Sequence, residues 1–435
     1  MSKPIPTGTA RGNVDCDGQN GVSRRNFVKT GVFGFMGLSL LDLMKASVLA
    51  DGAAISKCDA VILLWLAGGP SHIDTFDPKP GQATNGPFKP RNTSVDGIQI
   101  GEHLPVIGRN MKHAALIRSL TSKEGSHERA TYEMHTGYKP LGSIKHPSLG
   151  SLVVQQKEKK NPEIPAYVHI GGPSFGAGFL GTQMAPFYIG DPNAPTRNLD
   201  FHTTVDHERF TRRVHLLNGL DKEFASQNRD QTVLDYGNYN KDAVRMMYSK
   251  SVEAFDLNKE PEIYRKGYGD NNFGKGCLMA RRLVEKGVRF VEVTLGGWDT
   301  HNDAFTAIER NCNTLDPALG TLLEDLNARG LLKRTMVICT GEFGRTPTIN
   351  ARNGRDHYPR VWSGLIAGGG IKAGYVHGSS DALGAGVKDD PVGPGELHAT
   401  MFECLGVDYA KENTTDQGRP IRVVEKGKPV QGLLA

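Results

Sequence analysis

Cysteine is scarce in the sequence, and its spacing excludes two classes of protein. Six cysteines occur in 435 residues, and one of them, Cys16, lies in the N-terminal stretch. The other five form no C-x-x-C pair, so neither a zinc knuckle nor a complete disulfide framework is predicted. Cys339 and Cys404 stand in apolar stretches, which is typical of core residues.

A large excess of charge of one sign is also missing. The chain carries 52 Lys and Arg against 47 Asp and Glu. Six of the basic and three of the acidic residues lie in the first fifty positions, which leaves 46 against 44, a net charge of +2, for the remainder. Without basic stripes flanked by aromatic residues, so small a charge argues against nucleic acid as a partner. Repeats and low-complexity tracts are missing as well, as in an ordinary globular chain.

The N-terminus has the pattern of a twin-arginine export signal. Polar residues lead to Arg24 and Arg25, a small and apolar run covers 31–43, and Val48-Leu49-Ala50 suits a signal peptidase. A buried helix or a membrane span is disfavoured because the run is short and rich in glycine. We expect residues 1–50 to be the signal, exported folded by the twin-arginine translocation machinery to the periplasm or the cell surface. The mature chain, 51–435, is expected to be one domain without a stable membrane span.

Alternating apolar runs and helical patterns predict the fold of the mature chain. Expected strands cover 60–66, 114–118, 166–170, 288–295, 335–340 and 361–367. Expected helices run from Ser126 to Gly137, from about Ser148, and over 277–286, 316–328 and 396–405, with a helical excursion at about 205–260. Alternation of this kind predicts an α/β fold with a mixed, mostly parallel central sheet and helices on both faces.

Three of the predicted strands run into acidic and histidine residues through glycine-rich exits. Ligands collect outside the carboxyl ends of strands in open α/β sheets, so one convergent site is expected there. Carboxylates and neutral imidazoles bind a divalent cation that assists hydrolysis, and this mixture favours zinc, manganese or iron over calcium alone, with one or two ions. The predicted metal ligands are His72, Asp74, Asp299, His301, Glu342, Asp356 and His357.

Several roles near this site stay open at the level of sequence. Arg345 is a candidate to grip an anionic oxygen, or to pair with Asp356. Asp356 itself is either a ligand or the partner that orients a ligand histidine. The nucleophile, if one is used, is Ser126, His127 or Ser71; otherwise water attacks directly.

Several motifs carry a family resemblance. Thr340-Gly341-Glu342-Phe343-Gly344 resembles the T-x-D-H-G element of the alkaline-phosphatase-like superfamily, and Asp356-His357 resembles its last ligand histidine. Asp299 with His301 or Asp303 resembles its D-x-x-x-H metal pair, and Asp74 with His72 its first acidic ligand. The segment from His127 to Gly137 is similar to the sulfatase helix in length and in its Thr-Gly ending. With the leader, the motifs GEFGRTP, GGWDTH and GRDHYP resemble the sulfatase-like bacterial family known as domain of unknown function 1501.

The chain also departs from this pattern. Phe343 replaces one metal ligand, His127 stands in the nucleophile slot that holds Cys or Ser, and Asp299 and His301 are separated by one residue rather than three. The resemblance implies an exported metal-dependent hydrolase of sulfate or phosphate esters. Its substrate would be an anionic ester, such as a sulfated or phosphorylated extracellular polysaccharide. The alternative is a non-catalytic exported binding or cell-envelope protein that retains the sulfatase-like fold. A mutase-type isomerase is disfavoured, because export removes it from sugar-phosphate metabolism.

Overall fold

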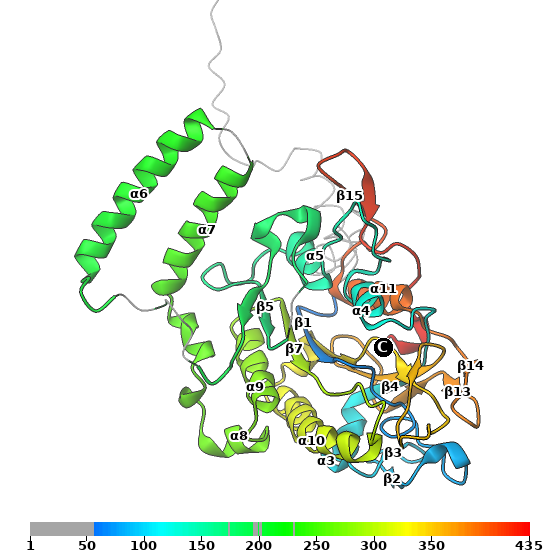
Figure 1. Ribbon diagram of the computed structural model, residues 1–435. Helices are drawn as coiled ribbons and strands as arrows, with labels where there is room; N and C mark the ends of the chain where they lie inside the picture. Colours follow the sequence, from blue (N-terminus) through cyan, green and yellow to red (C-terminus); the bar gives the residue numbers. More distant parts are fainter. Residues whose placement is uncertain (1–55, 173–174, 195–198, 200–201, 229–230) are drawn as a thin grey trace, which may run out of the picture. The chain divides into compact units, whose positions relative to one another are not determined.

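The computed structural model describes residues 56–172, 175–194, 199, 202–228 and 231–435. These described residues belong to one compact unit (Figure 1). The predicted export signal at 1–50 lies outside the described residues. Among those that are described, no helix combines the length and the apolar character that crossing a membrane requires.

The centre of the unit is an eight-stranded sheet in the order β12-β4-β11-β8-β1-β7-β5-β6. Its strands are β1 Ala60–Leu66, β4 Ala114–Leu120, β5 Tyr167–Ile170, β6 Phe187–Ile189, β7 Phe290–Leu295, β8 Thr335–Thr340, β11 Trp362–Ala367 and β12 Tyr375–His377. In this sheet β11 runs antiparallel to its neighbours, β4 and β8, and the other neighbouring strands pair in parallel.

Both faces of the sheet are buried, which explains the continuous apolar runs of its strands. Ile62, Leu64 and Leu66 of β1 enter one core cluster, and the alternate residues Val61, Leu63 and Trp65 enter the other. The first core is covered by α3 Pro105–Asn110, α9 Asn272–Glu285 and α10 Ala304–Ala328, and the second by α4 His127–Thr136, α5 Leu149–Gln156 and α11 Pro394–Leu405 (Figure 1). The predicted fold class, a mostly parallel sheet with helices on both faces, is confirmed.

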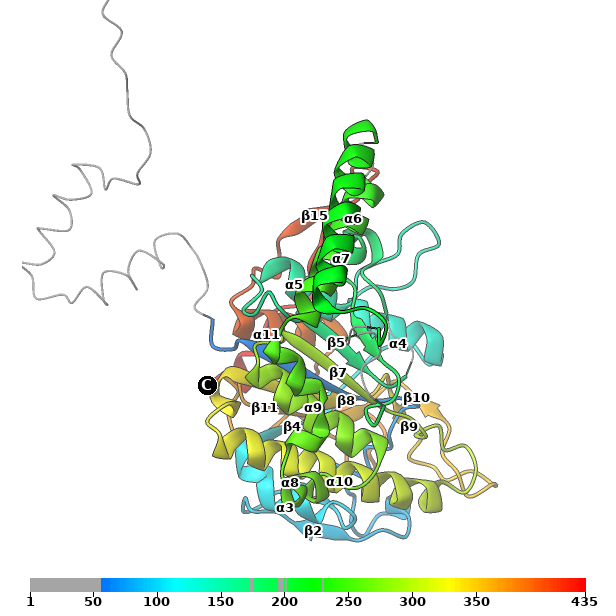
Figure 2. The same ribbon diagram turned by 90° about the vertical axis from the view of Figure 1, so that its left-hand side faces the viewer.

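Smaller elements surround this core. They are β2 Pro90–Asn92 with β3 Gln99–Gly101, β9 Gly344–Arg345 with β10 His357–Tyr358, β13 Ser379–Ser380 with β14 Val387–Asp389, β15 Glu412–Thr414 with β16 Pro420–Arg422, and α8 Glu262–Gly267. The β9–β10 pair follows the end of β8 and brings Arg345 opposite His357 (Figure 2).

One predicted helix begins at a different residue in the structure. The helix expected to begin at Asp316 is the second half of α10, which starts at Ala304 and continues through Pro317. The Asp316 carboxylate instead accepts hydrogen bonds from Val106 N at 2.9 Å and Ile107 N at 2.8 Å, and so caps α3. This tertiary contact explains why a residue with the pattern of a helix start lies inside a helix.

The helical excursion expected at about 205–260 consists of two helices. They are α6 His207–Gln227 and α7 Gln231–Met247, followed by a 3-10 segment at Lys250–Phe255. None of the residues of α6 is buried. Met246 of α7 does enter the first core cluster.

Candidate metal centre

The three strand exits with acidic and histidine residues meet at one edge of the sheet. In the sheet β1 lies between β7 and β8, and Trp65 of β1 is in register with Thr294 of β7 and Thr340 of β8. The strands therefore end at the same level. A Cβ at Gly68, after β1, would lie 2.4 Å from Asp299 N, and the φ of Gly68 is +117°. Only glycine at position 68 permits the segment after β1 to approach the segment after β7 so closely.

Three imidazole nitrogens converge on one carboxylate oxygen at this edge. Asp299 Oδ1 lies 3.1 Å from His301 Nε2, 3.4 Å from His357 Nε2 and 3.3 Å from His127 Nε2. His301 Nε2 and His357 Nε2 are 3.0 Å apart. One ligand atom each from His127, Asp299 and His357 lies within 4.8 Å of the other two. The exits of β7 and β8, together with the start of α4, thus supply three nitrogen donors and one oxygen donor.

The second nitrogen of each ring is held by an acceptor. His301 Nδ1 lies 2.7 Å from Asp356 Oδ1, His357 Nδ1 lies 2.8 Å from the Gly125 carbonyl oxygen, and His127 Nδ1 lies 2.6 Å from Glu342 Oε1. A carbonyl oxygen or a carboxylate accepts, so these partners place a proton on each Nδ1. In a neutral ring Nε2 then carries the lone pair. Three lone pairs directed at a carboxylate are the arrangement expected of a metal site with oriented ligands.

The charges around the cluster keep the carboxylates ionised. Burial raises the pKa of Asp299, but the hydrogen bond and charge of Arg345, then of His127, outweigh it and lower that pKa to about 2. The hydrogen bond from His301 lowers the pKa of Asp356. The hydrogen bond to Glu342 raises the pKa of His127, whereas burial lowers the pKa of His357. An ionised carboxylate beside a neutral imidazole such as His357 is a suitable donor set for a divalent cation.

Arg345 connects the Asp299 carboxylate of the cluster to the neighbouring backbone. Its side chain is fully buried, and its nitrogens donate to the carbonyl oxygens of Gly68, Gly69 and Arg355. Its Nη2 also lies 2.6 Å from Asp299 Oδ1. Of the two roles left open by the sequence, the pairing with Asp356 is not observed, because Arg345 pairs with Asp299. Because these hydrogen bonds to carbonyl oxygens use most of the guanidinium N–H groups, few N–H groups remain to bind an anionic oxygen of a ligand.

The first strand exit does not join the cluster. Asp74 forms a buried ion pair with Arg355, with 2.8 Å between its Oδ2 and Nε, and accepts a hydrogen bond from Ser71 at 2.5 Å. His72 Nε2 lies 2.9 Å from the Gly384 carbonyl oxygen, and the ring is buried. The carboxylate of Asp74 and the hydroxyl of Ser71 are therefore already committed to other groups of the protein. The ligand roles predicted for His72 and Asp74 gain no support from this geometry.

The remaining candidates lie around the cluster with different partners. Asp303 precedes α10 with a φ of +49° and is not part of the nitrogen cluster. Ser126 stands at the N-cap of α4, but its side chain makes no capping hydrogen bond. Glu342 also accepts a hydrogen bond from Gly68 N at 2.9 Å, and its Oε2 is buried without a partner among the described residues. The Phe343 ring packs against His127 and His357 at centroid distances of 4.9 and 4.7 Å.

Sequence reasoning missed one buried group close to the cluster. His135 of α4 and Glu292 of β7 form a buried pair, with 2.8 Å between His135 Nε2 and Glu292 Oε1. The clue in the sequence was a carboxylate inside the apolar strand FVEVTL, which requires a buried partner.

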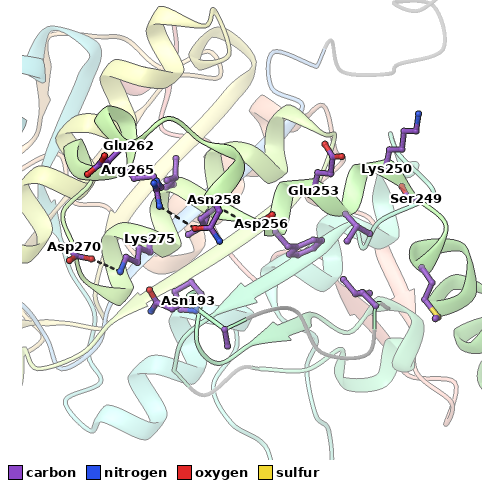
Figure 3. Close-up of a pocket in the computed structure, with 18 of the residues that line it drawn as sticks. Asn193, Ser249, Lys250, Glu253, Asp256, Asn258, Glu262, Arg265, Asp270 and Lys275 are labelled. Carbon is purple, nitrogen blue, oxygen red and sulfur yellow. Dashed lines mark hydrogen bonds and ion pairs between the residues drawn. The ribbon is translucent and has the colours of Figure 1, made fainter. Parts of the chain in front are cut away.

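A large cavity elsewhere in the structure contains none of the candidate residues. It has a volume of about 890 Å³, and Figure 3 shows the charged side chains that line it. Lys275 pairs with Asp270 at 2.6 Å, and Lys266 pairs with Glu262 at 2.8 Å, so much of its charge is internally compensated. We therefore place the candidate functional site at the strand exits.

The fold and the cluster define an α/β protein with a candidate metal site of histidine and carboxylate side chains. The sequence profile of a family described as protein of unknown function (DUF1501) matches residues 58–434. The chain therefore belongs to this family, as its motifs predicted. No curated protein matches the chain.

Several solved structures are similar to the chain at low identity. PsFucS1 sulfatase from Pseudoalteromonas sp. is 14% identical, with 83% of this chain and 70% of that chain covered and a TM-score of 0.40. A protein in the alkaline phosphatase superfamily from Vibrio parahaemolyticus is 10% identical, with 88% and 72% covered and a TM-score of 0.39. The C-terminal periplasmic domain of EcEptC from Escherichia coli, in complex with Zn, is 9% identical, with 88% and 95% covered and a TM-score of 0.39.

Proposed function

We propose that the protein is an exported metal-dependent hydrolase of sulfate or phosphate esters, acting on extracellular polysaccharide. The observation that carries this proposal is the convergence of three imidazole Nε2 atoms on Asp299 Oδ1. The pattern of residues 1–50 supports export by the twin-arginine route to the periplasm or the cell surface.

The residues that would hold the ion are His127, His301, His357 and Asp299. Three nitrogens and one oxygen suit zinc, and they also suit manganese or iron better than calcium. Glu342 and Asp356 then act as orienting partners of His127 and His301 rather than as ligands. Phe343 places an apolar ring against two of these histidines, which favours one ion over two.

The chain's own groups prepare the site in two ways. Arg345 fixes the Asp299 carboxylate with Oδ1 facing the imidazoles, because its remaining nitrogens are anchored to backbone carbonyls. Glu342 and Asp356 hold the protons of His127 and His301 on Nδ1, which leaves Nε2 of each ring available as a donor. A divalent cation bound here would supply Lewis acidity toward an ester oxygen and would lower the pKa of water.

Metal content and ester cleavage, measured on the same protein, test the proposal. We expect near-stoichiometric zinc, manganese or iron by elemental mass spectrometry, and cleavage of at least one member of a panel of sulfate and phosphate monoesters. His301→Ala should lose the metal and the activity. His377→Ala, which removes a buried histidine outside the cluster, should keep both.

The binding-protein alternative has its own outcome. If the wild type binds metal and cleaves nothing in the panel, the non-catalytic interpretation takes precedence. If the wild type stays metal-free after metal addition, the proposed function is wrong.

A further inference from the structure

A second cavity adjoins the histidine cluster and has a volume of about 460 Å³. This volume is within the range of pockets that hold small organic ligands. His127, Asp299 and Glu342 form the side next to the cluster. The other residues that line it are Trp65, Ala67, Gly68, Glu128, Thr131, His135, Phe175, Thr294, Gly296 and Gly297. A molecule whose ester group reached the cluster would have its organic part in this cavity.

The acidic side chains that line the cavity have no lysine or arginine beside them among the described lining residues. The described residues that line it include the acids Glu128, Asp299 and Glu342, but neither lysine nor arginine. The nearby Arg345 is fully buried and is bound to Asp299 and to backbone carbonyls. A negatively charged substituent on the ring, directed away from the ion, would thus face the Glu128 carboxylate with no lysine or arginine of the lining to pair with.

His135 does not change this balance, because its charge is compensated within the protein. Its Nδ1 donates to the Thr131 carbonyl oxygen at 2.8 Å, and its Nε2 lies 2.8 Å from Glu292 Oε1. Glu292 also accepts a hydrogen bond from the Tyr167 hydroxyl at 3.1 Å and lies 3.5 Å from His169 Nδ1. Both ring nitrogens of His135 thus face oxygen acceptors, so the ring carries two protons and its charge is neutralised by the Glu292 carboxylate. Glu292 raises the pKa of His135, although burial opposes this.

Aromatic rings line the cavity beside this pair. The Phe175 ring stacks on His135 with 4.7 Å between centroids and 27° between planes. The Trp65 ring meets His135 edge-on at 4.3 Å. Flat apolar faces of this kind bind the faces of other rings, whether these are aromatic or the C–H faces of sugars.

From this combination we infer that the cavity binds an uncharged ring, a neutral sugar or an aryl group, as the organic part of the ester. The inference deepens the proposed function and rests on it, since it assigns the ring to the substrate of the same site. It also makes Phe175 a specificity-determining residue and Glu128 a group that excludes acidic rings.

Binding of ester-free ligands tests the inference without relying on turnover. The probes are phenyl β-galactoside, its 4-carboxyphenyl analogue, methyl β-galactoside and benzyl alcohol, titrated calorimetrically into the metal-loaded full chain. We expect the uncharged phenyl galactoside to bind at least about tenfold more tightly than the carboxylate analogue. Methyl galactoside and benzyl alcohol distinguish a sugar site from an aryl site.

Two substitutions link the binding to the cavity. Phe175→Ala should weaken phenyl galactoside binding about fivefold, whereas Phe224→Ala, an exposed phenylalanine on α6, should not weaken it. Thr131→Lys brings a cation to the cavity wall and should reduce the discrimination against the carboxylate analogue.

Three results would overturn the inference. They are equal binding of the neutral and carboxylate probes, the same affinity in Phe175→Ala as in wild type, and no detectable binding of any probe to metal-loaded protein. Failure of the proposed function would give a different result, namely missing metal or missing ester cleavage. The affinities of these ester-free probes are measured independently of cleavage.

Discussion

His301 Nε2 and His357 Nε2 lie 3.0 Å apart, although the partners of both rings place their protons on Nδ1. Two lone pairs at this distance repel each other unless a proton or a cation lies between or beside them. Asp299 adds a further negative oxygen 3.1 Å from His301 Nε2. The cluster is therefore an arrangement of like acceptors that a cation would stabilise, and the first two predictions test this.

Asp356→Ala should weaken metal binding about 10- to 100-fold, because His301 loses the acceptor that holds its proton on Nδ1. Competition with a chelator of known affinity measures the change. Glu309→Ala removes an exposed acid of α10 and serves as the control, with wild-type affinity expected. An unchanged affinity in Asp356→Ala would show that the orientation of His301 does not depend on this carboxylate.

His127→Ala should lower the metal affinity by at least about tenfold, since it removes a nitrogen donor 3.3 Å from Asp299 Oδ1. The adjacent Ser126→Ala should leave the affinity unchanged. Elemental analysis after dialysis against a weak chelator compares the two variants. Full metal retention in His127→Ala, together with a covalent adduct on His127 in the wild type, would instead favour the nucleophile role that the sequence left open.

Arg345→Lys should reduce the free energy of unfolding by about 3 kcal/mol, because lysine cannot replace the several bonds of a fully buried guanidinium. Urea titration measures this, with Arg352→Lys on the neighbouring exposed loop position as control. If Arg345 gripped the substrate instead, the variant would keep its stability and show only a higher KM for esters.

Asp74→Asn should separate stability from metal binding. The Asp74 and Arg355 side chains are both completely buried, and breaking such a pair costs about 3 kcal/mol or more. Because Asp74 lies outside the nitrogen cluster, the folded variant should keep its metal. Asp299→Asn should show the opposite pattern, with metal lost. Metal loss in folded Asp74→Asn would restore Asp74 as a ligand, as the sequence predicted.

The fold was predictable because its strands are continuous apolar runs. Ala60–Leu66 and Thr335–Thr340 are completely buried on both faces, so hydrophobicity alone marks them. The convergence of Asp299, His301 and His357 followed from one further rule, that parallel strands deliver their exits to the same sheet edge.

The partners within the site were not predictable in the same way. His127 and Glu342 are 215 positions apart, and no spacing indicates that they meet. Asp74 follows a buried strand just as Asp299 does, yet its carboxylate pairs with Arg355, a tertiary contact that local sequence does not encode. The helix start predicted at Asp316 was wrong for a similar reason, because the backbone groups that this carboxylate caps belong to α3.

The protein should become less stable as the pH falls from 7 to 5, because the fold buries His398 as a neutral ring. The ring is buried, its Nε2 donates to the Met134 carbonyl oxygen at 2.9 Å, and Nδ1 has no partner among the described residues. Burial lowers the pKa of His398 to about 4. The folded pKa is thus below the unfolded value of about 6.5, so the unfolded state binds the proton first and stability is lost as the pH falls below 6.5.

The expected loss from His398 between pH 7 and pH 5 is about 2 kcal/mol of unfolding free energy. His398→Gln can still donate to Met134 but does not titrate, so its stability should change less over this range. His398→Gln should remove only part of the pH dependence of stability, because burial also lowers the pKa of His72 to about 4. Urea titrations at both pH values measure the change, with the exposed His202→Gln as control. The same pH dependence in His398→Gln and wild type would show that His398 is not the group whose neutral state the fold requires.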